Sequence, residues 1–275
     1  MPKNTAMNNK FIKEYVQEHY GFDFDTASTE DLAKVEEIVV NDVTGFYNRD
    51  CEWDFSSFPN LRVLDCGYNF IKKLDVSQNL KLEKLKWAGT RGGFEEYPDI
   101  SNNKKLKSLI VGQDSTVELD LSNNEELESL TIYVTSEMRW LDVSSCKHLK
   151  EIDMEGVNIL FVDLTGCNEL SYVNINYLNL YRNREDEFGD GFPRPLIFVN
   201  ESFDENVIKE HTRNLKDYAY YLVRVRPNSA EERLLTELKG RKAEMIDIPE
   251  DRYGRYVAIK HYEILDRLYE LRNQE

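Results

Sequence analysis

Apolar residues recur through the middle of the chain at a nearly constant spacing. One leucine opens each copy of the pattern, and successive copies lie 21 to 24 residues apart, at Leu61, Leu82, Leu106, Leu127, Leu149 and Leu170. In the first copy Leu64 and Cys66 stand two positions apart, so both side chains point to one side of an extended segment. One copy cannot bury that apolar side alone. The spacing therefore predicts that successive copies stack against one another.

A second phrase, with an aspartate at its centre, keeps the same period. Its copies are Leu74-Asp75-Val76-Ser77, Asp99-Ile100-Ser101, Leu119-Asp120-Leu121-Ser122, Leu141-Asp142-Val143-Ser144 and Val162-Asp163-Leu164-Thr165. Two interleaved signals with one period of about 20 to 29 residues are typical of leucine-rich repeats. The predicted fold class is an α/β repeat. We expect a leucine-rich-repeat solenoid with a parallel β-sheet, flanked by an N-terminal helical cap and a C-terminal, mainly helical cap or small domain.

The turn after each aspartate phrase has its own recurring position, which holds Asn79, Asn103, Asn124, Cys146 and Cys167. A buried Asn can hydrogen-bond backbone groups that a tight bend leaves unpaired, and a Cys can fill the same space. We interpret this column as scaffold. Cys146 and Cys167 should lie close together in adjacent coils. Stacked thiols are the preferred interpretation of this pair, and a disulfide is the alternative.

The central aspartates form a second column, Asp75, Asp99, Asp120, Asp142 and Asp163. Carboxylates stacked in neighbouring coils repel one another unless something compensates their charge. Bound calcium is one possible compensation. Hydrogen bonds from nearby turn amides or from the following Ser are the other, and we prefer this explanation because Asp-x-Ser segments favour such turns.

The repeat subtype resembles a known bacterial family. The run Leu61-Arg-Val-Leu-Asp-Cys-Gly-Tyr-Asn-Phe-Ile-Lys-Lys-Leu-Asp-Val-Ser-Gln-Asn79 is similar to the 21-residue leucine-rich repeats of the internalin J type. The resemblance covers roughly residues 56–183 and implies a curved recognition surface rather than a particular ligand. The chain departs from the family because only Cys66 occupies the strand cysteine position. A continuous cysteine ladder is therefore not expected.

We divide the chain into an N-terminal helical cap (1–55), about six repeats (56–183) and a C-terminal cap or accessory domain (184–275). The first part should contain helices near residues 9–20 and from Ser28 or Thr29 onwards. The last part should contain a strand at 196–199, a helix from Asp204 to about Val225, and a helix from the Ser229 capping box to Gly240. A short strand at 245–248 and a helix over 256–272 complete this expectation.

The charge of the chain limits its partners. A net charge of -16 over 275 residues argues against direct binding of nucleic acid, which depends on neutralising phosphates, and fits a basic protein partner. The N-terminal residues show no apolar segment of a signal peptide, and no apolar run reaches the ~18 residues of a membrane span. We expect a cytoplasmic protein that does not insert into membranes, and leave secretion or delivery as an effector open.

The histidines and cysteines suggest no catalytic centre. His19, His148, His211 and His261 are scattered, and none lies near a nucleophile motif. The chain has no phosphate-binding loop and no dinucleotide fingerprint, and no cysteine follows Cys167 to serve a ligase domain after the repeats. We therefore expect no enzymatic activity, no catalytic residue, no cofactor and no bound metal.

The outward positions of the predicted strands are the candidate binding surface. The residues that we expect to contact a protein partner are Lys84, Lys86, Tyr133, Glu151, Asp153, Glu155 and Tyr172. An acidic strand beside aromatic side chains suits an Arg- or Lys-rich protein segment, and a plain solvated face is the competing interpretation. Two functional alternatives remain: a repeat-targeted effector with its activity in the C-terminal part, and an acidic immunity or inhibitor protein against a basic enzyme.

Overall fold

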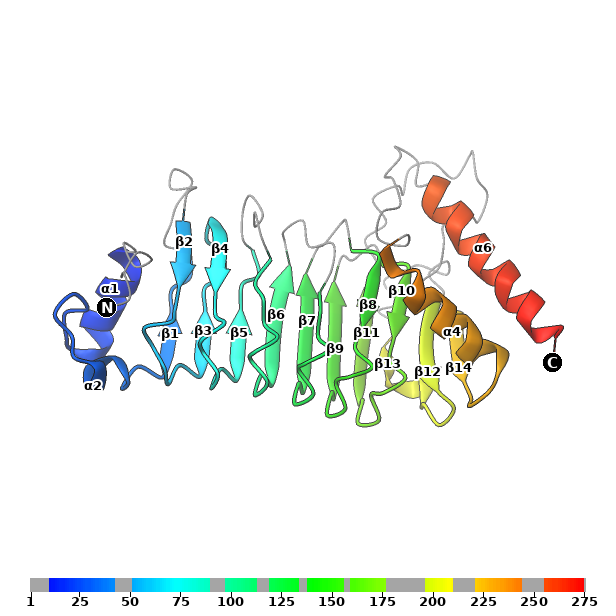
Figure 1. The fold of residues 1–275 in the computed structure, drawn as a ribbon, viewed down its shortest axis with the longest axis horizontal. Helices are drawn as coiled ribbons and strands as arrows, with labels where there is room; N and C mark the ends of the chain where they lie inside the picture. Colours follow the sequence, from blue (N-terminus) through cyan, green and yellow to red (C-terminus); the bar gives the residue numbers. More distant parts are fainter. Residues whose placement is uncertain are drawn as a thin grey trace.

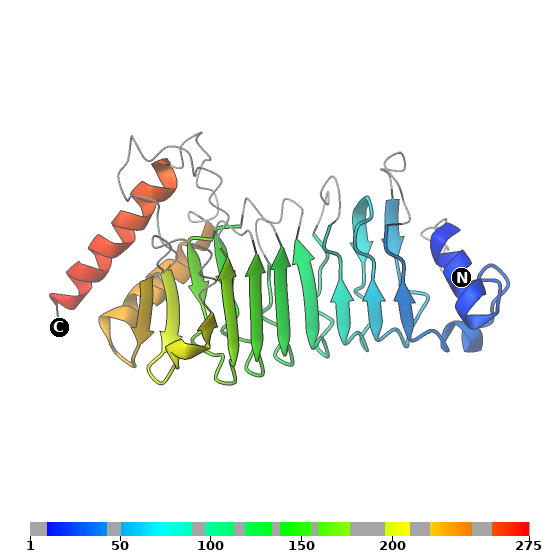
Figure 2. The same cartoon turned by 180° about the vertical axis from the view of Figure 1, so that it is seen from behind.

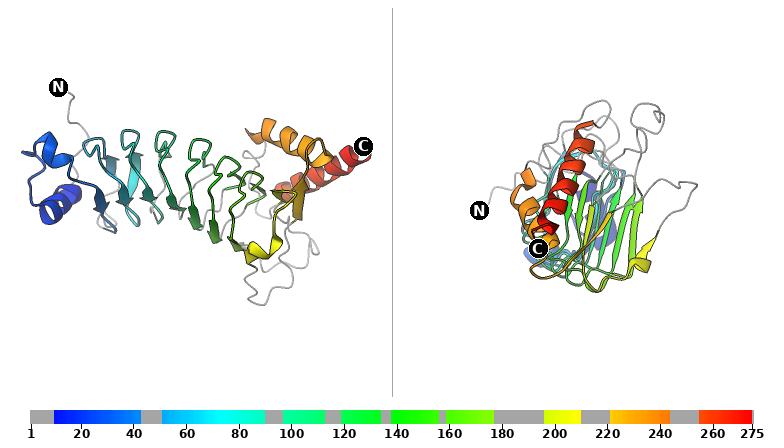
Figure 3. Two further views of the ribbon diagram at one scale, coloured as in Figure 1. Left: turned by 90° about the horizontal axis from the view of Figure 1, so that it is seen from below. Right: turned by 90° about the vertical axis from the view of Figure 1, so that its right-hand side faces the viewer.

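The computed structural model describes residues 10–42, 51–89, 97–112, 119–133, 138–155, 159–176, 196–209, 221–243 and 255–274. Its coils lie side by side along the long axis of the molecule (Figure 1). Helix α1 (Lys10–Tyr20) lies at one end and helix α6 (Arg255–Arg272) at the other, as the view from below also shows (Figure 3).

One long parallel sheet forms a side of the stack. Its strands, in spatial order, are β1 (Glu37–Val39), β3 (Val63–Asp65), β5 (Lys84–Lys86), β6 (Ser108–Gly112), β7 (Ser129–Tyr133), β9 (Glu151–Glu155), β11 (Tyr172–Asn176) and β13 (Ile208–Lys209). The register aligns the inward apolar positions, so that Leu85 pairs with Leu109 and Leu109 with Leu130. This arrangement confirms the predicted leucine-rich-repeat solenoid. Figure 2 shows the sheet from the side away from the C-terminal helices.

Shorter sheets form on the other side of the coils. Strands β2 (Cys51–Asp54) and β4 (Ile71–Asp75) pair near the N-terminal end. Strands β8 (Trp140–Asp142), β10 (Phe161–Asp163), β12 (Leu196–Asn200) and β14 (Tyr221–Val225) form a four-stranded parallel sheet near the C-terminal end. The hydrogen-bonded coils therefore extend on both sides of the 56–183 range in which the sequence pattern is clear.

The column of turn residues is a buried hydrogen-bond ladder. Asn103 is 0% exposed, and its Nδ2 donates to the carbonyl oxygens of Val76 (3.0 Å) and Asn79 (2.9 Å) in the preceding coil. Asn79 and Asn124 make the equivalent bonds to the coils before them. The predicted scaffold role is thus confirmed, because these amides satisfy carbonyls in bends that water does not reach.

The sulfur atoms of the last two members continue this ladder. Cys146 and Cys167 are buried free thiols, and the Cys167 Sγ lies 3.1 Å from the Val143 carbonyl oxygen. Burial, together with the Asp142 charge, raises the pKa of the Cys146 thiol to about 12. Stacked thiols, rather than a disulfide, are what the structure contains.

The aspartate column is compensated by backbone amides. In every copy an aspartate Oδ1 accepts a hydrogen bond from the amide two residues later, at 2.9 Å for Asp75, 2.9 Å for Asp99, 3.0 Å for Asp120, 3.0 Å for Asp142 and 2.8 Å for Asp163. These bonds lower the pKa of Asp120, chiefly through the Ser122 amide. The preferred explanation of the column, turn hydrogen bonds rather than calcium, accounts for the geometry.

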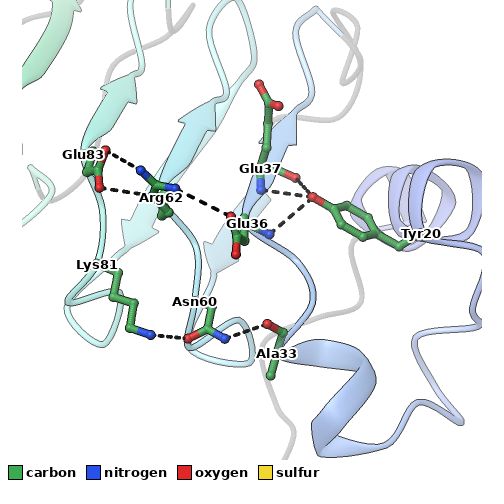
Figure 4. A network of polar contacts seen from close by, with 8 residues as sticks. All are labelled: Tyr20, Ala33, Glu36, Glu37, Asn60, Arg62, Lys81 and Glu83. Carbon is green, nitrogen blue, oxygen red and sulfur yellow. Dashed lines mark hydrogen bonds and ion pairs between the residues drawn. The ribbon is translucent and has the colours of Figure 1, made fainter.

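The N-terminal helices close the first coil. Helix α1 buries Ile12 and Val16, and its last residue, Tyr20, reaches the edge strand β1. The Tyr20 hydroxyl donates to the Glu37 carbonyl oxygen at 3.0 Å and accepts from the amides of Glu36 (3.3 Å) and Glu37 (3.1 Å) (Figure 4). These bonds occupy backbone groups that an edge strand otherwise leaves unpaired.

Helix α2 (Thr29–Leu32) is capped as predicted but is a single turn. The Ser28 Oγ accepts from the Asp31 amide at 3.1 Å, and the Asp31 carboxylate accepts from the Ser28 amide at 3.2 Å, which completes a capping box. Ile38, which the sequence pattern assigns to the inward side of this helix, lies in β1 instead.

The C-terminal helices cover the outer side of the four-stranded sheet. Helices α4 (Ala230–Gly240) and α6 share a second apolar core with strand residues, in which the Trp140 and Phe161 rings stack at 3.7 Å and the Phe198 ring follows at 4.9 Å. Both helices lie near the residues predicted for them. Lys239 on α4 forms ion pairs with Asp142 (2.9 Å) and Asp163 (2.6 Å) and so fixes the helix to two adjacent coils.

The helix predicted from Asp204 to Val225 is wrong at both of its ends. Asp204 caps a short 3-10 segment, η1 (Glu205–Val207), which leads directly into β13, and residues 221–225 form strand β14. The Asp204 side chain accepts from the Asn206 amide at 2.9 Å, the same two-residue turn that the repeat aspartates make. The middle of this prediction, with His211, lies outside the described residues, as does the strand predicted at 245–248.

Candidate protein-binding surface

The outward side chains of the eight-stranded sheet form three parallel rows, which we call the sheet face. Strand register places neighbouring strands about 4.8 Å apart and alternate residues of one strand about 6.6 Å apart. The first row contains Val63, Lys84, Ser108, Ser129, Glu151 and Tyr172. The second contains Asp65, Lys86, Ile110, Thr131, Asp153 and Asn174. The third contains Gly112, Tyr133 and Glu155.

The two predicted lysines differ in their surroundings. The Lys86 Nζ lies 3.0 Å from the Asp65 Oδ2 and 5.5 Å from the centroid of the Tyr68 ring, so its charge is already compensated within the chain. Lys84 is exposed and forms no ion pair with any residue that the structure describes. Strands β6 and β7 separate both lysines from β9. The structure therefore does not place either lysine beside the carboxylates of β9, although the Lys86 charge reaches Tyr133 and opposes the rise of its pKa.

The remaining five predicted residues do come together. Glu151, Asp153 and Glu155 are alternate residues of β9, and their side chains point outward from the sheet. Tyr133 lies on β7 directly beside Glu155, and Tyr172 lies on β11 directly beside Glu151. The result is a line of three carboxylates with a tyrosine on each side, which we call the acidic site.

The carboxylates of the acidic site lack cationic partners. Within the described part of the chain, neither Glu151 nor Glu155 takes part in a hydrogen bond or an ion pair of its side chain, and Asp153 accepts one hydrogen bond, from the Asn174 Nδ2 at 2.7 Å. Asn174 is 5% exposed, and its Oδ1 is buried without a hydrogen-bond donor among the described residues. A buried acceptor without a donor is uncommon in folded proteins and calls for an explanation.

The negative charge of the acidic site contributes to a raised pKa in both tyrosines. Partial burial raises the pKa of Tyr133, and the charges of Asp153 and Glu155 raise it further. The pKa of Tyr172 is raised by burial and then by Asp153 and Glu151. Both phenols therefore remain protonated at neutral pH. Aromatic rings next to carboxylates form a surface that attracts cations.

Charges at the edge of the same sheet are arranged differently. The residues that precede the strands alternate in sign from coil to coil, as Arg62, Glu83, Lys107, Glu128 and Lys150. Arg62 contacts Glu83 at 3.0 Å, and Glu128 contacts Lys150 at 2.7 Å and Lys107 at 3.9 Å. This edge is neutralised within the chain, whereas the acidic site is not.

Sequence reasoning did not single out Asn174, Asp65 or Tyr68 as members of a site. Asp65 and Asn174 are outward residues of their strands, so their positions follow from the repeat pattern. Tyr68 is 40% exposed with a φ of 59°, a backbone conformation unusual for Tyr, and no sequence signal places its ring over Lys86.

The described residues contain neither a candidate metal site nor a candidate membrane span. Among the described residues no three His, Cys, Asp or Glu side chains are placed to hold a metal ion. None of the helices within the described ranges is both long enough and apolar enough to cross a membrane.

The hydrogen-bonded coils and their asparagine ladder define the class of the chain, a leucine-rich-repeat solenoid. No family model and no curated protein matches it. Three of the similar solved structures are internalins. The functional domain of InlJ from Listeria monocytogenes, which includes a cysteine ladder, is 22% identical with a TM-score of 0.45, and the match covers 55% of this chain and 32% of that one.

Two further internalins of the same organism cover more of the chain. Internalin C2 is 12% identical with a TM-score of 0.41, over 78% of this chain and 93% of that one. Internalin InlF is 16% identical with a TM-score of 0.31, over 80% of this chain and 76% of that one. The chain spans about a third of the length of the InlJ domain.

Proposed function

We propose that the protein is a non-enzymatic binding module whose sheet face holds a protein partner through a basic segment. The observation that carries the proposal is the acidic site: Glu151 and Glu155 have no cationic partner among the described residues, although comparable charges at the strand edge are paired. Charges left uncompensated on a rigid surface attract a partner of opposite charge and orient it, while adjacent tyrosines supply contact area.

The rest of the sheet face is compatible with close approach of a partner. Between the lysines and the acidic site, strands β6 and β7 present mostly small or short side chains, Ser108, Gly112, Ser129 and Thr131, with Ile110 as the larger one among them. A partner that extends beyond the acidic site meets little steric obstruction there. The predicted residue Lys84, exposed at the far side of these strands, supplies a positive charge for an acidic residue of the same partner.

Affinity capture with matched variants tests the proposal. The immobilised full chain should retain a protein from an extract of its native cell, and Glu151→Lys with Glu155→Lys should abolish that retention. Glu125→Lys with Glu126→Lys is the control, because both residues are exposed, lie on a turn and change the net charge equally. Retention that survives in the acidic-site variant, or that is lost in the control as well, would contradict binding at this site.

A further inference from the structure

Resting on the proposed function, we infer that the acidic site recognises arginine rather than lysine, on an extended segment that carries arginine at alternate positions. The side chain that the acidic site recognises is thus arginine, and its spacing along the partner is every second residue. It follows from two features: an example of cation binding within the same sheet face, and the geometry of the carboxylate line with a tyrosine on each side.

The chain itself shows how this face holds a cation. Lys86 lies between the Asp65 carboxylate, at 3.0 Å, and the Tyr68 ring, at 5.5 Å. The acidic site repeats the two ingredients, carboxylate and tyrosine, on neighbouring strands, but no cation of the described residues occupies it. The two positions differ because Lys86 supplies the cation beside Asp65, whereas a partner can supply the cation at the acidic site.

The donors required by the acidic site favour guanidinium over ammonium. Each of the three carboxylates offers two acceptor oxygens side by side, which the point charge of a lysine ammonium does not engage through two parallel bonds. Arginine offers five N–H groups in a planar fork that binds a carboxylate through two parallel bonds. Its flat face also stacks on an aromatic ring, which an ammonium cannot do. Tyr133 and Tyr172 stand on either side of the carboxylates where such stacking is possible.

The spacing of the carboxylates defines the form of the partner. Glu151, Asp153 and Glu155 are alternate residues of one strand, so they are about 6.6 Å apart. Alternate residues of an extended peptide have the same spacing and point to the same side. An extended segment with arginine at every second position, laid along β9, therefore matches the carboxylates one to one. Consecutive arginines point to opposite sides and cannot match all three.

Three synthetic peptides of equal charge test the inference, with affinities measured by calorimetry on the full chain at physiological ionic strength. They are Arg-Ser-Arg-Ser-Arg, Lys-Ser-Lys-Ser-Lys and Ser-Arg-Arg-Arg-Ser, all with blocked ends. We expect the alternating arginine peptide to bind about threefold to tenfold more tightly than the lysine peptide, the range that exposed ring–cation contacts provide. The block of consecutive arginines should also bind more weakly.

Substitutions of Tyr133 and Tyr172 test how much their rings contribute to the preference for arginine. Tyr133→Leu with Tyr172→Leu should lower the preference for arginine over lysine, because ring stacking is lost while the paired bonds to the carboxylates and the apolar contact remain. Tyr133→Phe with Tyr172→Phe keeps the rings and should keep the preference. If the leucine variant is misfolded by circular dichroism, the phenylalanine variant and the comparison of peptides still decide the matter.

The outcomes distinguish this inference from the proposed function. Equal binding of arginine and lysine peptides that Glu151→Lys with Glu155→Lys abolishes would overturn the arginine preference and leave the basic-partner proposal standing. Equal binding of the alternating and consecutive arginine peptides would overturn the extended form. Binding that the charge variant does not change would contradict both proposals.

Discussion

Replacement of Asn103 by alanine should destabilise the solenoid more than any exposed substitution in the same turn. Asn103 is fully buried, and its Nδ2 donates to the carbonyl oxygens of Val76 and Asn79. Both carbonyls keep one backbone bond, from the amides of Asn79 and Leu82 respectively, so neither is left without a donor. The loss is therefore the net value of two hydrogen bonds, about 1–3 kcal/mol. The void left by the carboxamide group, which is larger than a methyl group, adds at least about 1 kcal/mol, so the total is about 2–4 kcal/mol or more.

The chain supplies two controls for this substitution. Asn103→Cys places in this slot the residue that occupies it at Cys146 and Cys167, where the Cys167 Sγ lies 3.1 Å from a carbonyl oxygen. It fills the space and keeps a weak donor, so it should cost less than alanine, about 1–2 kcal/mol. Asn102→Ala changes an exposed neighbour and should alter stability by less than about 0.5 kcal/mol.

Urea unfolding followed by far-UV circular dichroism measures the three variants against the wild type. Each coil contacts only its neighbours, so amide hydrogen exchange should also show faster opening in the coils on both sides of Asn103 than at the ends of the stack. The reasoning is refuted if Asn103→Ala unfolds at the same urea concentration as Asn102→Ala, or if the cysteine variant is as unstable as the alanine variant.

Three further predictions concern the C-terminal end and the thiols. Lys239→Met should lower the free energy of unfolding by about 1–3 kcal/mol, because it leaves Asp163, which is 0% exposed, without its cation; Lys239→Arg should recover part of the loss in the same urea titration. Residues 188–275 expressed alone should show no cooperative thermal transition, since their apolar core lacks Trp140, Leu160 and Phe161; a cooperative transition would indicate an independent accessory domain. Cys146 and Cys167 should react with a thiol reagent at neutral pH only after unfolding, because burial raises the pKa of Cys146 to about 12 and that of Cys167 as well; rapid modification of the native protein would contradict this.

The repeat pattern was sufficient to predict the eight-stranded sheet, because each inward apolar position recurs at the repeat spacing and one-residue slips would turn the whole set outward. The first coils were missed because they lack the opening leucine. Their aspartate phrase was nevertheless present as Trp53-Asp54-Phe55-Ser56, and the Ser56 amide donates to the Asp54 Oδ1 at 2.7 Å as in the later copies. The aspartate turn is therefore a more general signal of a coil in this chain than the leucine.

The helix predicted over 204–225 failed for a related reason. The Asp204 signal that suggested a helix cap belongs to the same aspartate turn. Some of the apolar residues whose spacing suggests a helix, such as Leu222, lie in strand β14. Strands of two to five residues give too few positions for their alternation to be distinguished from a helical pattern.

The docking of the C-terminal helices also had a signal in the sequence. The residue before the Leu-Asp or Val-Asp pair points away from the core, and it is Lys73 in an early coil but Trp140 and Phe161 in later ones. Large aromatic residues at an outward position require a cover. The change from Lys73 to Trp140 thus marks where α4 and α6 begin to lie over the coils.

The sequence gives the positions of the charged residues around the acidic site, but not which of them pair with one another. Arg62, Glu83, Lys107, Glu128 and Lys150 look like unrelated charges until register places them in adjacent coils, where opposite signs meet. The same register sets Glu151 between Ser129 and Tyr172, and Asp153 between Thr131 and Asn174, so none of the residues directly beside them on the adjacent strands is a cation. Pairing depends on neighbours more than 20 residues away, which local patterns do not show. Because one register neutralises the edge and leaves β9 negative, the negative charge of β9 is a property of this surface rather than of the acidic composition as a whole, and β9 is where a basic partner is best sought.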